Sequence, residues 1–175
     1  MRNLTEFFRS DWQGDNSSQY RKYMEKEIKF RRISGGELGI IKPLWMKLND
    51  MHYRKSVHFK DFYSSFTFEK RISKFGTFPE EKLFIEVIER EHQPLGYCIS
   101  TIDDKQNGEI DSLYIEEEYR KKGLGEKLTL NSIAWLREQG CRRIVVAVSH
   151  GHEAVFPFYE KYGFYPRLTY LELQD

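Results

Sequence analysis

The chain has 175 residues, enough for one domain with a sizeable hydrophobic core. Its 28 lysines and arginines nearly balance 27 aspartates and glutamates, and a net charge of +1 gives no overall field favouring nucleic acid or an acidic membrane. No apolar run approaches the roughly 18 residues of a membrane-spanning helix, and the first residues lack a signal-peptide stretch. Two cysteines, Cys98 and Cys141, make no disulfide framework. We therefore expect a cytoplasmic protein that binds neither membranes nor nucleic acid.

The polar residues 1–27 are predicted to form an extension ahead of a domain that spans residues 28–175. Alternating apolar and charged residues predict a first strand at residues 28–33. A helix should follow and run to about His52. It must begin or bend at Pro43, because proline has no backbone N–H to donate.

A second helix is predicted at residues 59–74, with a buried aromatic stripe at helical spacing: Phe59, Phe62, Tyr63 and Phe66. Such a stripe usually belongs to the core, although one at a cleft can also contact a ligand. Strands are predicted at residues 82–89, 95–102 and 109–115. The last two are joined by a polar hairpin loop that ends in Asn-Gly.

The C-terminal part alternates between helices and strands. Residues 126–139 have the pattern of a helix that ends at Gly140, and residues 143–148 that of a β-branched strand. A last helix at residues 152–162 should be followed by strand-forming residues at 164–173. This order indicates an α/β protein with a mixed sheet.

The most informative feature is the Gly-rich turn between a predicted strand and a predicted helix, Tyr119-Arg120-Lys121-Lys122-Gly123-Leu124-Gly125. The first amides of a helix have no partner within it, and the helix dipole places partial positive charge there. The two glycines let a phosphate approach the backbone closely, and the three basic side chains add charge. The pattern favours a phosphate-bearing ligand, although a solvated basic turn has the same composition.

Two motifs together resemble the GNAT superfamily of acetyl-CoA-dependent N-acetyltransferases. The run from Leu113 to Gly125 is similar to the family's L-Y-V-x-P-E-Y-R-G-K-G-I-G motif, and the run from Phe158 to Phe164 has the form F-Y-E-K-x-G-F. The resemblance is good from Glu109 onwards and only in outline before it. His152 stands where the family usually has a CoA-contacting Asn, and Val155 where it usually has Ala.

The resemblance implies an α/β fold whose mixed, mostly antiparallel central sheet is flanked by helices. The strands that end near Ile115 and Val148 should splay apart and admit acetyl-CoA as cosubstrate. It would be held by these residues: Leu113, Tyr114, Ile115, Arg120, Lys121, Lys122, Gly123, Leu124, Gly125, Glu126, His152 and Tyr159. The implied reaction is direct acetyl transfer to a primary amine of a small molecule or peptide. The sequence leaves open whether the protein forms a homodimer.

This reaction needs a proton acceptor for the amine and a proton donor for the leaving thiolate. At pH 7 only about one primary amine in 2,000 is neutral. Asp111 is the first candidate base, because strand parity would place it on the same side as Ile115; an ordinary surface carboxylate is an equal alternative. Glu109 and Glu86 are weaker candidates. Tyr159 is the candidate acid, unless it is only a packed helix tyrosine.

Other interpretations remain open. The chain could bind acyl-CoA as a sensor or a partner-binding domain without turnover. His150-Gly151-His152 has no evident third ligand, so no metal site is predicted. The predicted acceptor wall is aromatic and acidic, which suits a cationic amine and equally an ordinary helix pair: His52, Tyr53, His58, Asp61 and Tyr63.

Overall fold

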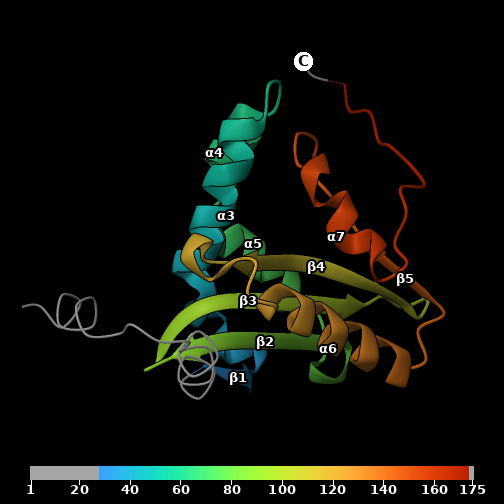
Figure 1. Cartoon of the computed structure of the whole chain (residues 1–175). Helices are drawn as coiled ribbons and strands as arrows, with labels where there is room; N and C mark the ends of the chain where they lie inside the picture. The colour runs from blue at the N-terminus through green and yellow to red at the C-terminus, as the bar shows by residue number, and fades with distance from the viewer. Residues whose placement is uncertain (1–27, 174–175) are drawn as a thin grey trace, which may run out of the picture.

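The computed structural model describes residues 28–173, which form one five-stranded sheet flanked by helices (Figure 1). The strands lie side by side in chain order: β1 (Lys29–Arg32), β2 (Leu83–Arg90), β3 (Gln93–Ile102), β4 (Asn107–Ile115) and β5 (Arg143–Val146). Neighbours are antiparallel except β4 and β5, which are parallel. The predicted fold class is confirmed. The predicted extension, residues 1–27, lies outside the described residues.

Helices cover both faces of the sheet. On one face lie the elements that precede β2: η1 (Gly35–Ile41), α3 (Lys42–Lys55), α4 (Lys60–Ser65) and α5 (Phe68–Phe75). Their core includes Trp45, Ile85 and Tyr97. The long helix α6 (Leu124–Glu138) covers the other face through Leu128, Leu136 and their neighbours. Because both faces are covered, β2 is buried along most of its length.

Local sequence signals explain most element boundaries. Helix α3 begins at Lys42 with Pro43 in its first turn, as predicted. The β3–β4 hairpin is present, but Asn107 and Gly108 lie in β4, and Gln106 takes the positive φ of the turn. A Cβ at Gly108 would lie 2.6 Å from a Leu136 methyl group, so a larger residue there would force the buried Leu136 side chain to shift.

The prediction of one helix over residues 59–74 is wrong. The segment forms α4 and α5, with a break at Phe66, and the side chain of Thr67 caps α5 by accepting the amide of Lys70 at 3.2 Å. The aromatic stripe therefore does not enter the core as a unit. Phe62 is 52% exposed, while Phe66 only packs against the edge of the core.

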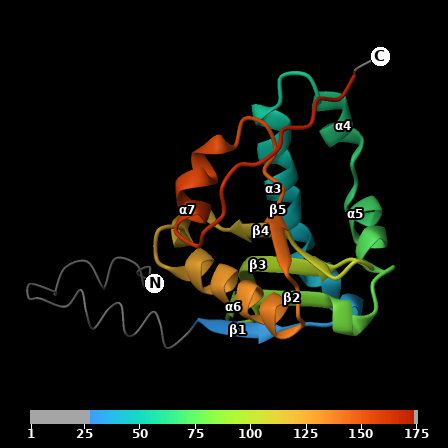
Figure 2. The ribbon, with the colours of Figure 1, turned by 90° about the vertical axis from the view of Figure 1, so that its right-hand side faces the viewer.

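The predicted terminal strand is also wrong. Residues 164–173 have no regular secondary structure; Phe164 still packs against the core, but the apolar side chains from Tyr165 onward are exposed. Pro166 lacks an amide donor and interrupts the segment. Before this tail, the short η4 (Glu153–Val155) and α7 (Phe156–Glu160) rise beside α3 over the end of the sheet formed by β4 and β5 (Figures 1 and 2).

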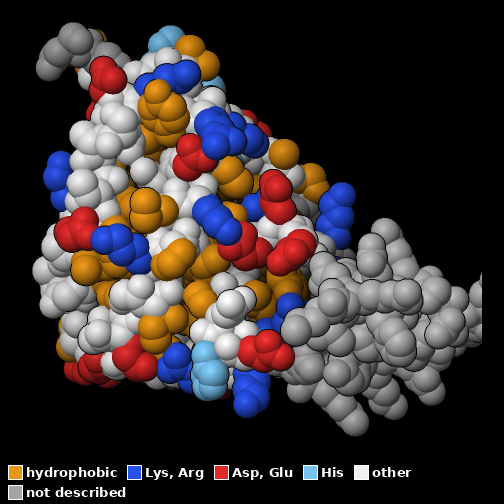
Figure 3. Space-filling model, turned by 90° about the vertical axis from the view of Figure 1, so that its left-hand side faces the viewer, with side chains coloured by type: hydrophobic (Ala, Val, Ile, Leu, Met, Phe, Trp, Pro, Cys, Tyr) orange, Lys and Arg blue, Asp and Glu red, His pale blue; other side chains and the backbone are white. Residues whose placement is uncertain are grey.

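The surface shown in Figure 3 intersperses acidic, basic and apolar side chains. This mixed pattern agrees with the near balance of charges in the sequence. Among residues 28–173, no helix combines the length and apolar character needed to cross a membrane.

Candidate functional site

The site begins where two parallel strands part. β4 and β5 pair only from Asn107 with Arg143 to Ile110 with Val146. Beyond this point β4 continues to Ile115, whereas the chain after Val146 leaves the sheet. A cavity of about 900 Å³ lies in the opening, lined on one side by the end of β4 and on the other by residues 146–149. The splay implied by the family resemblance is therefore present.

The Gly-rich turn opens into this cavity. After the short η3 (Glu117–Tyr119), Lys121 and Gly123 adopt positive φ angles of 59° and 81°, and Gly123 is the N-cap of α6. The first helical hydrogen bond runs from the amide of Lys127 to the carbonyl of Gly123 at 3.0 Å. The amides of the preceding first turn have no acceptor within the helix. They form a positive pole beside the cavity.

Gly125 lies in the first turn of α6 and lines the cavity. A Cβ at this position would have ordinary contacts, 3.7 Å from Phe158 Cζ and 3.8 Å from Ile115 Cγ1. The protein itself therefore does not require glycine there. Close approach of a ligand to the backbone would require it.

Ten of the twelve predicted cofactor-binding residues line the cavity, and Lys122 and Leu124 do not. Leu124 packs against the α6-side core, and the ammonium of Lys122 lies 5.1 Å from the Tyr119 ring centroid. Arg120 lines the cavity but also holds the turn, because its Nε donates to the Ile115 carbonyl at 2.9 Å.

A β-bulge in β4 changes the position of Asp111. Ile99 of β3 is paired with Ser112, and Ser100 with Ile110, so Asp111 is the extra residue between them. The bulge reverses the alternation of side chains after it. Asp111 therefore contacts α5, whereas Ile115 packs on the α6 side. The parity argument that placed these two residues on one side is wrong.

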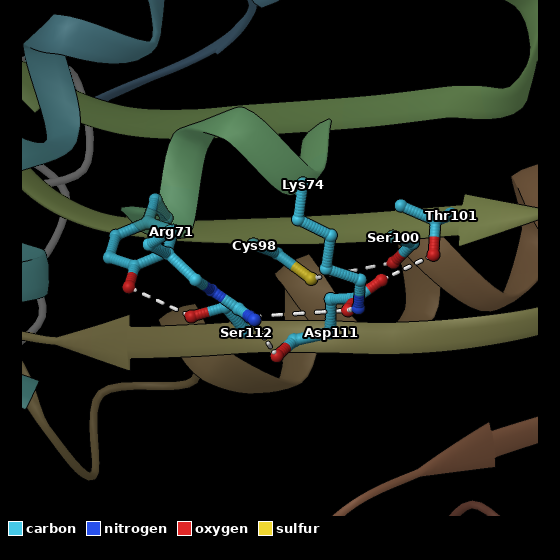
Figure 4. Close-up of polar contacts among 8 residues, drawn as sticks. Arg71, Lys74, Cys98, Ser100, Thr101, Asp111 and Ser112 are labelled. Carbon is cyan, nitrogen blue, oxygen red and sulfur yellow. Dashed lines mark hydrogen bonds and ion pairs between the residues drawn. The ribbon is translucent and has the colours of Figure 1, made fainter. Parts of the chain in front are cut away.

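The Asp111 carboxylate is buried within a network of polar contacts (Figure 4). Lys74 donates to Oδ1 and Thr101 donates to Oδ2. Arg71 donates from Nη2 to the Asp111 carbonyl at 2.8 Å, and the same nitrogen is 4.0 Å from Oδ1. Both carboxylate oxygens are thus engaged, which favours a role in joining α5 to β4. As the catalytic base, Asp111 stays a prediction.

The two weaker carboxylate candidates lie in different places. Glu109 is half-buried and lines the cavity, and burial together with the nearby Asp111 raises the pKa of its carboxyl. Glu86 instead faces α6 and accepts the side-chain amide of Asn131 at 2.9 and 3.1 Å. Glu109 can therefore reach a ligand in the cavity.

Tyr159 lies on α7 and lines the cavity. Its ring contacts Phe158 and Phe164 with centroid distances of 5.1 and 5.9 Å. Burial, with a smaller effect from Cys98, raises the pKa of its hydroxyl above the usual tyrosine range. The phenol therefore stays protonated at neutral pH, as a proton donor must.

The acceptor side was only partly predicted. His52 and Tyr63 line the cavity, but Tyr53, His58 and Asp61 do not. Sequence reasoning missed further lining residues on α3, on α4, at the break after α4 and on α5: Trp45, Phe62, Phe66, Arg71 and Lys74. Phe62 and Phe66 belong to the aromatic stripe, for which the sequence favoured the core, and Trp45 belongs to the helical pattern of α3. The sequence could not predict that Arg71 and Lys74 line the cavity, because the bulge at Asp111 determines which groups of β4 they contact.

His150 and His152 do not form part of a metal cluster. Among residues 28–173, no three His, Cys, Asp or Glu side chains are grouped to hold a metal ion. His150 is exposed, whereas His152 is buried and lines the cavity.

A family model described as the acetyltransferase (GNAT) family matches residues 45–164, which contain the parted strands, the Gly-rich turn and α7. The chain belongs to this family. It is 40% identical over 63 residues to N-alpha-acetyltransferase 30 of Schizosaccharomyces pombe, a match that covers 35% of this chain and 42% of the relative. It is 30% identical over 83 residues to glucosamine 6-phosphate N-acetyltransferase of Trypanosoma brucei brucei, a match that covers 42% of this chain and 54% of the relative. The matches thus span about half the length of these relatives.

Solved structures support the fold of this GNAT protein. PaiA N-acetyltransferase from Thermoplasma acidophilum, in complex with coenzyme A, is similar with a TM-score of 0.66 and 19% identity, over 81% of this chain and 92% of that one. At this identity the likeness concerns the fold. It agrees with the resemblance found in the two sequence motifs.

Proposed function

We propose that this GNAT protein binds acetyl-CoA and transfers the acetyl group directly to a primary amine of a small molecule or peptide. The proposal is carried by one observation. The strands β4 and β5 part at the place where the Gly-rich turn and the first turn of α6 open into the same cavity. A pyrophosphate and an extended thioester arm can therefore bind to adjacent backbone groups.

The backbone would hold the cofactor. Amides from Lys121 to Glu126 would bind the pyrophosphate at the positive end of α6. Beyond Ile110 no strand covers the edge of β4, and the backbone of Leu113 and the amide of Ile115 would pair there with the pantetheine arm in the manner of an added strand. An amide on this edge would also polarise the thioester carbonyl and stabilise the oxyanion that forms on attack.

Tyr159 would protonate the leaving thiolate. When the C–S bond breaks, the electron pair moves to sulfur, and a thiol of ordinary pKa near 8.5 needs only modest help to leave. Tyr159 lines the cavity, and its hydroxyl remains protonated because burial raises its pKa. A hydrogen bond from this phenol to sulfur would supply the proton.

The acceptor amine would enter between α3, α4 and the end of β4. Phe62 and Phe66 stack there with ring centroids 5.4 Å apart, and Tyr63 is next to them. Aromatic faces attract an ammonium group before it loses its proton. The names of the two relatives point to an alpha-amino group and to glucosamine 6-phosphate as acceptors. Both carry a primary amine.

A non-catalytic acyl-CoA sensor is the second candidate. It is favoured by the bulge that turns Asp111 into an ion-paired residue and by His152 in place of the family's usual Asn. Such a protein would bind acetyl-CoA without consuming it.

The test is to incubate the protein with acetyl-CoA and a panel of peptides, polyamines, amino sugars and aminoglycosides. Release of free CoA thiol, together with acetylated amine found by mass spectrometry, would support the enzyme. Tight CoA binding without product from any acceptor would support the sensor.

A further inference from the structure

A histidine pair joins the two walls of the cavity. His52 lies on α3, and His152 lies in the loop that leads from β5 into η4. Nδ1 of His52 is 3.1 Å from Nε2 of His152, and their ring centroids are 4.6 Å apart. Tyr63 of α4 stacks on His52 with a centroid distance of 5.3 Å. A direct hydrogen bond thus links the acceptor side to the loop after β5.

Both rings are neutral at neutral pH. Burial, together with smaller effects of His152, Arg71 and Lys55, lowers the pKa of His52 to about 4. Burial and Lys55 also lower the pKa of His152, while Glu153 opposes them. The charged groups that face the pair therefore come from α3, α5 and η4.

The shared hydrogen bond leaves two outward ring nitrogens, Nε2 of His52 and Nδ1 of His152. Within residues 28–173, neither has a hydrogen-bond partner and neither is sealed from solvent. A neutral imidazole has one N–H and one lone pair. Whichever ring donates the shared hydrogen, one outward nitrogen therefore carries a lone pair and the other carries a hydrogen.

We propose that His52 and His152 act together as the proton acceptor for the attacking amine. The inference rests on the proposed N-acetyltransferase function. The amine nitrogen bonds to the thioester carbonyl carbon, the C–S bond breaks, and the N–H proton moves to the outward nitrogen that carries the lone pair. The shared hydrogen then crosses to the other ring, whose outward N–H releases a proton to water. The pair ends neutral with its hydrogen bond reversed.

The pair suits this step better than the carboxylate predicted from the sequence. Both Asp111 oxygens are engaged by Lys74 and Thr101, whereas His52 and His152 line the cavity and each keeps one ring nitrogen outside their shared hydrogen bond. A weak base is sufficient, because the nitrogen becomes much more acidic once it is bonded to the carbonyl carbon. A neutral pair also does not repel an approaching ammonium group.

The first experiment compares pH profiles of kcat/KM for wild type, His52→Phe, His152→Asn and the double variant, with an acceptor that the wild type acetylates. His52→Phe keeps a ring to stack on Tyr63, and His152→Asn restores the family's usual residue. Each single variant should lose about 100-fold at pH 7 and less at high pH, a magnitude typical of lost general base catalysis. The double variant should be no slower than the slower single variant, because the two rings act as a unit.

Two controls separate this role from folding and cofactor binding. His150→Gln alters an exposed histidine in the same loop and should behave as wild type. Calorimetric CoA affinity should be unchanged in His52→Phe. In His52→Ala, added imidazoles should restore the rate, and more basic imidazoles should restore it more at equal concentrations of the neutral form.

Three results would overturn the proposal: unchanged pH profiles in the single variants, losses that multiply in the double variant, or no rescue of folded His52→Ala by any imidazole. A wild type that binds CoA but acetylates no amine would instead refute the enzyme function, and the histidine role with it. That outcome is distinct, because the wild type itself then forms no product.

Discussion

The two sides of the cavity are built differently. The side proposed for the cofactor comes mainly from one continuous stretch, Leu113 to Glu126, and its proposed binding groups are mostly backbone amides fixed by a turn and a helix start. The side proposed for the acceptor comes from side chains on α3, α4, α5 and the loop after β5. A contiguous backbone site leaves a motif in the sequence, whereas a site assembled from distant side chains leaves only separate residues.

The difference predicts that a substitution at Gly125, where the protein itself has room for a Cβ, acts mainly through the ligand. In Gly125→Val, the side chain fills the space that the proposed pyrophosphate would occupy, and CoA affinity should fall by at least about 100-fold, the equivalent of roughly 3 kcal/mol. Titration calorimetry measures this loss. Affinity within a few-fold of wild type in a folded variant would refute the cradle.

Glycine at position 123 offers a matched control. Gly123 has a φ of 81° and no heavy atom within 4 Å of a built Cβ, so Gly123→Ala should cost about 1–2 kcal/mol of stability through backbone strain alone. Gly125→Ala should instead keep or slightly raise helix stability while weakening CoA binding. Equal losses of stability at the two positions would contradict this contrast.

Tyr159→Phe should separate chemistry from binding. The variant removes one hydroxyl and little volume, and turnover should fall by about tenfold to a thousandfold if that hydroxyl protonates the thiolate. The dissociation constant for CoA should barely change. Full turnover, with chemistry shown to limit the rate, would make Tyr159 a packing residue.

The sequence predicted most of the fold and the proposed cofactor side, because both depend on patterns within continuous stretches of the chain. Hydrophobic periodicity located the five strands and α6, and the Gly-rich turn placed the start of α6 at residue 126, two residues after its observed start at Leu124. Sequence-based prediction failed where contacts between distant parts of the chain determine the local geometry. The bulge at Asp111 depends on the register with β3, and the histidine pair joins residues 100 positions apart in the chain.

The histidine pair should make stability depend on pH. Because the pKa of His52 is about 4 when folded and 6.5 in its ordinary state, the unfolded chain binds more protons between these values. The neutral His52 ring therefore contributes up to about 3 kcal/mol to the free energy of unfolding. This contribution is complete above pH 6.5 and is lost as the pH falls toward 4. Urea unfolding of wild type and His52→Phe at several pH values measures this. The same pH dependence in both proteins would show that His52 is not desolvated.

Asp111→Asn should affect stability more than the pH profile of the rate. Loss of the buried carboxylate removes the ion pair with Lys74, and since Lys74 is partly exposed we expect about 1–2 kcal/mol of destabilisation. Lys74→Gln should cost a similar amount, because it breaks the same pair. A pH–rate profile that steepens in Asp111→Asn, with turnover lost, would instead make Asp111 the base predicted from the sequence.

The most direct test of the account follows the acetyl group itself. Acetyl-CoA labelled in its acetyl carbon is incubated with the wild-type protein and the amine panel, and both free CoA thiol and labelled amide are quantified. The account predicts equal amounts of the two products, formed only when an acceptor amine is present. Tight binding of acetyl-CoA with no labelled amide from any acceptor would contradict it.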